Sequence, residues 1–157
     1  MDSTDLTNYV ARVHGRTREA VERLREELVG WRPRPSEFTA GELVLHIANT
    51  RRMNMVRLSG VPHTYAGHEV ADGATVADLL AEVDASAAEV AARLTEVDLM
   101  LPVKIAPMGS GFGWQIVLGG LIEHEVHHRS QLCEYLSGMG IEPPALYGLH
   151  VEDFPRA

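Results

Sequence analysis

The chain has 157 residues, of which 45% are hydrophobic and 23% are charged, as expected for one globular domain over residues 1–157. Its net charge of −8 argues against binding to nucleic acid or to an anionic membrane surface, because both require a basic face. Cys133 is the only cysteine, the N-terminus is polar and acidic, and no apolar run approaches the ~20 residues of a membrane span. These features predict a cytoplasmic protein without disulfides.

Apolar residues at helical spacing, bounded by residues that start or stop helices, predict four helices. The expected ranges are about 6–28, 40–58, 76–94 and 112–137. Capping boxes at Thr39–Glu42 and Thr75–Asp78 open the second and third helices. The fourth is expected to follow a turn at Gly109–Gly111, and a short strand is expected within Leu99–Ile105.

The connections on either side of the third helix are both roughly 15 residues long. Such a segment can extend to about 50 Å, whereas a 20-residue helix is about 30 Å long. At least one connection can therefore run the length of the bundle, so that two consecutive helices lie parallel.

His124 and His128 are four residues apart in the fourth helix. They should lie on one face, about 5–6 Å apart at Cβ, where one metal ion can bind both imidazoles. At 100° per residue they flank the apolar face. That face is expected to hold Trp114, Leu118, Leu121, Leu132 and Leu136.

His46 is the best candidate for a third ligand, because it flanks the apolar face of the second helix in the same way. Three imidazoles leave a position open for water or substrate, which is typical of a catalytic zinc site. The other histidines considered are expected to be poorer ligands because they lie near the chain ends or in a connection: His14, His63, His68 and His150.

Glu125 falls in the middle of the apolar face of the fourth helix. A buried carboxylate is costly without a partner, so we expect a cation, a hydrogen bond or a metal-bound water beside it. Arg51 is one candidate, because it lies on the apolar side of the second helix.

Two other interpretations of residues 124–128 remain open. Their pattern, H-E-x-x-H, is the signature of zinc peptidases, in which Glu125 would be the general base. Gln131 and Glu134 stand where an extended form of that motif has glycine and histidine. Alternatively, the histidines are polar surface residues and bind no metal.

Three segments together resemble the DinB superfamily of four-helix metalloproteins, which includes the YfiT-like enzymes. They are GELVLHIA at 41–48, HEVHHRSQL at 124–132 and GIEPP at 140–144. The resemblance covers nearly the whole chain, although Ser130 stands where the family usually has glycine. It implies an all-α four-helix bundle with up-down-down-up connectivity and long connections, assembled as a homodimer. It also implies a divalent metal, zinc before nickel, iron or manganese, bound by His46, His124 and His128.

The resemblance further implies a transferase that uses a low-molecular-weight thiol of the mycothiol or bacillithiol type, activated at the metal. Glu125 or Gln131 would then position the thiol or a metal-bound water. One alternative is a hydrolase of a small substrate with Glu125 as general base. Another is a stress-response protein that binds metal without turnover.

Overall fold

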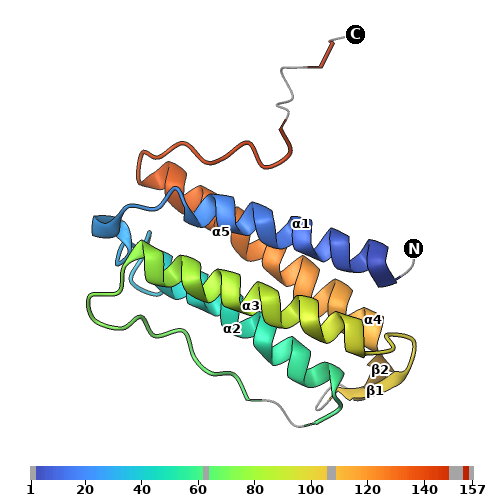
Figure 1. Ribbon diagram of the computed structural model, residues 1–157. Coiled ribbons are helices and arrows are strands. Elements are labelled where there is room, and N and C mark those ends of the chain that lie inside the picture. Colours follow the sequence, from blue (N-terminus) through green and yellow to red (C-terminus); the bar gives the residue numbers. More distant parts are fainter. Residues whose placement is uncertain (1–2, 62–63, 106–108, 149–153, 156–157) are drawn as a thin grey trace.

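A computed structural model describes residues 3–61, 64–105, 109–148 and 154–155. Four long helices lie side by side and form the body of the protein (Figure 1): α1 (Ser3–Val21), α2 (Ala40–Leu58), α3 (Val76–Glu96) and α5 (His124–Gly138). A 3-10 helix (Glu26–Leu28) follows α1, while α4 (Gly113–Gln115) and a π-helix (Ile116–Glu123) lead directly into α5. None of the described helices is both long and apolar enough to cross a membrane.

The four helices run up, down, down and up (Figure 1). The connection between α2 and α3 returns along the bundle, so these two helices are parallel, as the length of the connection predicted. Around the bundle, α1 packs against α3 and α5, and α2 packs against α3 and α5. The predicted connectivity is therefore confirmed, and it places α2 beside α5, the two helices that carry the predicted ligands.

Both predicted capping boxes are present. Thr39 Oγ1 accepts a hydrogen bond from the Glu42 amide at 3.1 Å, and the Glu42 carboxylate accepts one from the Thr39 amide at 2.6 Å. Thr75 and Asp78 repeat the arrangement at the start of α3. These side chains satisfy amide groups that a helix N-terminus leaves unpaired, which fixes where α2 and α3 begin.

The interior consists of two apolar clusters, one toward each end of the bundle, with a polar layer between them. One cluster includes Leu43, Leu79, Leu132 and Leu136. The other includes Val10, Val90, Val117 and Leu121. The buried polar side chains of the middle layer come from all four long helices: His14, Thr17, Arg51, Ser86 and Glu125.

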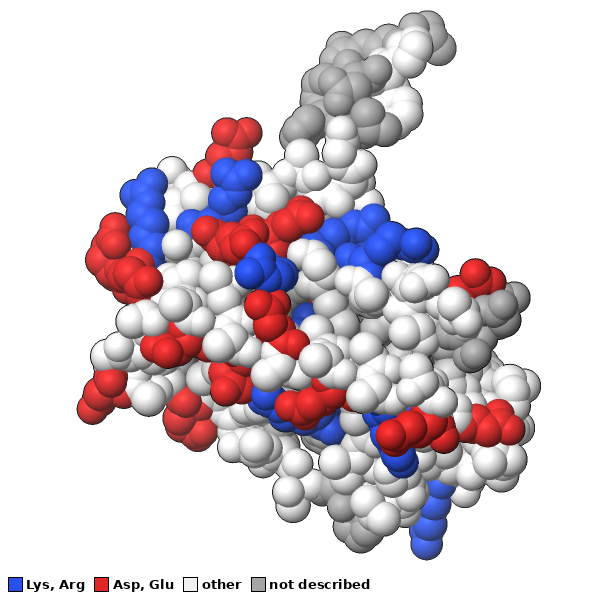
Figure 2. All heavy atoms as spheres, viewed as in Figure 1, with Lys and Arg blue, Asp and Glu red and all other residues white. Residues whose placement is uncertain are grey.

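The surface is charged with both signs. Figure 2 shows acidic and basic side chains interspersed over the face formed largely by α1 and α3. Arg18 of α1 pairs with Asp84 of α3 at 2.9 Å, and Arg52 of α2 pairs with Glu82 and Glu89 of α3 at 2.8 and 3.0 Å. Exposed pairs of this kind contribute up to about 1 kcal/mol each, so the buried layers carry most of the stability.

The first helix is shorter than predicted, because α1 ends at Val21 rather than near residue 28. The amides of Arg23 and Leu24 bond to carbonyl groups only three residues back, and Arg25 is extended. Leu24 is nevertheless buried. The apolar spacing therefore continues past the end of the helix, which explains the error.

The strand predicted within 99–105 is β1 (Pro102–Ile105), but the turn predicted at Gly109–Gly111 is wrong. These residues begin β2 (Gly109–Phe112), which pairs antiparallel with β1. Gly109 has φ +97°, a conformation that glycine adopts without strain. The glycines therefore start a strand instead of reversing the chain.

The predicted fourth helix is a composite, and its first half does not follow the expected angles. In the π-helix, i→i+5 hydrogen bonds place more residues in each turn than in an α-helix. Trp114 and Leu118, predicted to be buried, are 38% and 39% exposed, whereas Leu121 is buried as predicted. Leu132 and Leu136, counted from His124 along regular helix, are buried as predicted.

Asn54 of α2 stabilises the π-helix. Its side-chain amide donates to the Gly120 carbonyl at 2.6 Å and to the Thr50 carbonyl at 3.0 Å. A Cβ at Gly120 would lie 2.5 Å from Asn54 Oδ1, so any other residue would have to displace this buried amide. The π-helix ends directly before His124, and this contact therefore helps to set where α5 begins.

Candidate metal centre

The structure brings the three predicted ligands together. α2 carries His46, and the first turns of α5 carry His124 and His128 on one face. His46 Nε2 lies 3.1 Å from His124 Nε2 and 3.1 Å from His128 Nε2. The three candidate ligand atoms all lie within 4.8 Å of one another. The rings therefore converge through their Nε2 atoms.

Burial keeps these imidazoles neutral. Desolvation, followed by the proximity of the other imidazoles, lowers the pKa of His46 and of His124 from 6.5 to about 4. Burial also lowers the pKa of His128, against the opposing effect of a hydrogen bond to Gln131. The neutral imidazole is the form that binds a metal, so these three side chains can act as ligands at neutral pH without first losing a proton.

The arrangement fits a divalent transition metal. Zn–N bonds of about 2.0–2.1 Å, at angles of about 90–110°, place two ligand nitrogens about 2.9–3.4 Å apart. The separations of 3.1 Å from His46 Nε2 to His124 Nε2 and to His128 Nε2 fall within this range. Imidazole nitrogen suits zinc, nickel, iron and copper, and a cation relieves the repulsion between converging lone pairs.

Gln131 contacts His128 at Nδ1, the ring nitrogen that does not face the other two histidines. Its Oε1 atom lies 3.0 Å from His128 Nδ1, and its Nε2 group donates to the Tyr135 hydroxyl at 3.3 Å. Tyr135 in turn donates to Glu37 at 3.3 Å. Such partners fix the tautomer and orientation of a ligating imidazole. The Gln131 amide thus positions His128, while its role in positioning a thiol or a metal-bound water stays a prediction.

His46 has a corresponding partner on the connection between α2 and α3, which the sequence did not reveal. His46 Nδ1 lies 2.8 Å from the Tyr65 hydroxyl, which is also 3.1 Å from His68 Nδ1. Phe38 packs against the rings of His46 and His68, with centroid distances of 5.1 and 4.5 Å. Burial, with a smaller effect from Glu69, raises the pKa of Tyr65 to about 12, so its hydroxyl remains protonated. His68 was expected to be a poorer ligand because it lies in a connection; it contacts Tyr65 and is not among the three converging nitrogens.

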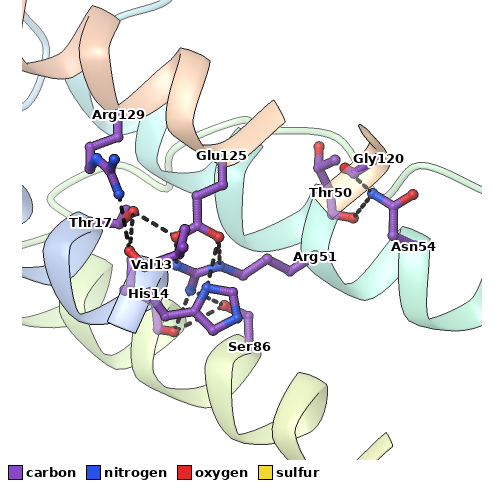
Figure 3. A network of polar contacts seen from close by, with 11 residues as sticks. Val13, His14, Thr17, Thr50, Arg51, Asn54, Ser86, Gly120, Glu125 and Arg129 are labelled. Carbon is purple, nitrogen blue, oxygen red and sulfur yellow. Dashed lines mark hydrogen bonds and ion pairs between the residues drawn. The ribbon is translucent and has the colours of Figure 1, made fainter. Parts of the chain in front are cut away.

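Glu125 belongs to the polar layer instead of the metal centre (Figure 3). Only 1% exposed, it accepts hydrogen bonds from Arg51 Nε at 2.8 Å and Arg51 Nη2 at 2.5 Å. Thr17 Oγ1 and His14 Nδ1 add bonds at 2.6 and 2.8 Å. The expected Arg51 partner is confirmed. The general-base role predicted for Glu125 loses its geometric basis, because both oxygens are already bound within the layer.

The electrostatics of this layer favour an ionised Glu125. Burial alone would raise its pKa, but the charge of Arg51 and the hydrogen bonds from His14 and Arg51 lower it well below the ordinary value. His14 is neutral at pH 7, because burial lowers its pKa more strongly than Glu125 raises it. The layer therefore holds one Arg–Glu ion pair, with Arg51 also donating to the Val83 carbonyl and to Ser86.

The remaining histidines take no part in the cluster of three Nε2 atoms as far as the chain is described. His127 is exposed and its ring packs against His128, with centroids 4.7 Å apart. His63 and His150 lie outside the described residues.

Comparisons with known proteins agree with the fold. The crystal structure of the DinB-like protein YjoA from Bacillus subtilis has a TM-score of 0.73 and 20% identity, covering 90% of this chain and 96% of that one. YfiT from Bacillus subtilis is described as a probable metal-dependent hydrolase with an unusual four-helix bundle topology. It has a TM-score of 0.70 and 17% identity, covering 89% of each chain. No curated protein sequence matches significantly. The family model of the DinB superfamily matches residues 9–132, and the chain therefore belongs to that superfamily.

Proposed function

We propose that the chain is a metal-dependent enzyme in which His46, His124 and His128 bind one divalent ion. The observation that carries the proposal is the convergence of three neutral Nε2 atoms, two of the separations being 3.1 Å. Three protein ligands leave coordination positions open, as in catalytic rather than structural zinc sites. Zinc is the first candidate.

For the reaction, we propose transfer of a low-molecular-weight thiol to an electrophile. A divalent ion bound here would supply a nucleophile at neutral pH by favouring the thiolate form of a thiol. The three histidines would hold the ion, and Gln131 orients the His128 ring through a hydrogen bond at His128 Nδ1. All three rings are partly buried.

The position of Glu125 argues against activation of water by the peptidase-type mechanism. Activation of water in a zinc hydrolase of the peptidase type needs a general base near the metal, as assigned to the glutamate of H-E-x-x-H. Among the described residues, the cluster contains three histidines and no carboxylate, and Glu125 is bound in the polar layer. A thiolate needs no such base, because metal coordination itself stabilises it.

Hydrolysis of a small substrate is the second candidate. It is supported by the structural likeness to YfiT, which is described as a probable metal-dependent hydrolase. The peptidase interpretation is weaker, because it depends on Glu125 as general base.

The test combines metal content with turnover. We expect about one zinc or nickel ion per chain by plasma mass spectrometry, with the content reduced in His46→Ala and His124→Ala. His127→Ala is the matched control, because its exposed ring lies beside the cluster without joining it.

Turnover is measured as loss of a thiol together with a haloarene electrophile, before and after chelation. Chelator-sensitive consumption would support thiol transfer, whereas chelator-sensitive ester hydrolysis without thiol consumption would favour the second candidate. If the chain takes up no divalent ion even after incubation, the metal-dependent function is wrong.

A further inference from the structure

The connection between α2 and α3 brings two polar side chains, Tyr65 and His68, to the outer side of His46. The connection runs back along the bundle (Figure 1) and is anchored midway by Asn49, whose side chain donates to the Gly67 carbonyl at 2.8 Å. Gly67 has φ +92°, which disfavours other residues. The segment therefore docks at a defined place, with the Tyr65 hydroxyl between His46 and His68.

The hydrogen-bond chain has a direction set by the metal centre. An imidazole that offers its Nε2 lone pair to a metal carries its proton on Nδ1. His46 must then donate from Nδ1 to the Tyr65 oxygen, and the single hydroxyl hydrogen of Tyr65 is left for His68 Nδ1. If Tyr65 instead donated to neutral His46, the His46 proton would lie on Nε2, facing His124 and His128.

We infer that Tyr65 is a positioning residue for the metal ligand His46, and that His68 acts through Tyr65. The hydroxyl accepts the Nδ1–H of the His46 tautomer that exposes the Nε2 lone pair, and it holds the ring toward the other two ligands. This inference rests on the proposed metal-dependent function. It assigns a surface connection, with no helical pattern of its own, a role in setting the affinity of the centre.

The first experiment measures Zn²⁺ affinity of metal-free protein by competition with a chromogenic chelator. Tyr65→Phe removes the hydroxyl and keeps the ring that packs against His46 and His68. We expect about tenfold weaker binding, the lower end of the loss for partners of ligating histidines. Tyr147→Phe is the control, because it also removes a hydroxyl that accepts a hydrogen bond, here from Arg129, whose guanidinium also donates to the Val13 carbonyl of α1. The zinc affinity of this variant should equal that of the wild type.

A double-mutant cycle tests whether His68 acts through Tyr65. His68→Ala should weaken binding less than Tyr65→Phe, and the combined variant should bind no more weakly than Tyr65→Phe alone. If the two losses instead multiply, His68 contributes independently of Tyr65, and that part of the inference is wrong.

A spectroscopic measurement separates tautomer selection from a general loss of structure. In the zinc-loaded protein, nitrogen-detected NMR of labelled histidine should show a His46 Nδ1–H that exchanges slowly with solvent, and faster exchange in Tyr65→Phe. Equal exchange and equal zinc affinity in the two proteins would overturn the inference while the metal-dependent function stands. If the wild-type chain binds no Zn²⁺, both are wrong.

Discussion

The buried pair of Arg51 and Glu125 gives the sharpest prediction about stability. Each side chain is 1% exposed, and two hydrogen bonds of 2.8 and 2.5 Å join them. Arg51→Met leaves Glu125 with two neutral donors, Thr17 and His14. Because a carboxylate would then be buried without a counter-charge, we expect a loss of about 3–5 kcal/mol in the free energy of unfolding.

The matched variant removes both charges together. In the double variant Arg51→Met with Glu125→Leu, neither charge of the pair remains. We therefore expect most of the lost stability to return, although His14 loses its bond to Glu125 and Ser86 loses its bond to Arg51. Urea unfolding followed by circular dichroism compares the wild type, the two single variants Arg51→Met and Glu125→Leu, and the double variant. If the double variant were as unstable as the sum of the single variants, charge compensation could not be the reason for the pair.

The same pair predicts how stability changes with pH. The folded-state pKa of Glu125 lies below its ordinary value of 4.5, so the unfolded chain binds the proton more tightly. The contribution of Glu125 is thus fully present above about pH 4.5 and is lost as the pH falls below that value. In Glu125→Gln, urea midpoints should show a weaker acid dependence in this range. An unchanged dependence would contradict the assignment.

Two further predictions concern the metal centre and the π-helix. The pKa values of His46 and His124 are lowered to about 4, so protons should compete only weakly with zinc down to about pH 5. Zinc release during acid titration measures this competition. Release centred near pH 6.5 would contradict the lowered pKa values. Gly120→Ala should destabilise the fold by about 1–3 kcal/mol, because the new Cβ would lie 2.5 Å from Asn54 Oδ1. Gly119→Ala, where the nearest atom is 3.9 Å away, is the control in urea unfolding and should show little loss.

The features that the sequence predicted correctly are those that depend on local pattern. The capping box at Thr39 and the apolar spacing after it locate α2, and hence His46, without knowledge of the other helices. Four-residue spacing likewise places His124 and His128 on one face of α5. Glu125 was recognisable as a buried acid because its position interrupts an apolar face.

The features that were missed depend on contacts between distant segments. In the π-helix, Gly120 accepts a hydrogen bond from the side chain of Asn54, a contact across 66 positions of the chain that leaves no local pattern. Tyr65 and His68 reach the site only because their connection docks along the bundle. Apolar spacing therefore indicated which helix faces are buried, but it predicted neither the π-helix nor the contacts of Tyr65 and His68 with His46.

The polar layer has a consequence for the axial alignment of the helices. Arg51 follows His46 on α2, and Glu125 is the neighbour of His124 on α5, so the ion pair and the metal centre span the same two helices. Sliding α5 by one turn, about 5.4 Å, would leave a buried charge alone and would also separate His124 and His128 from His46. An apolar interface would tolerate such slippage more readily. The ion pair thus fixes the axial position of α5 relative to α2 and so keeps His124 and His128 level with His46.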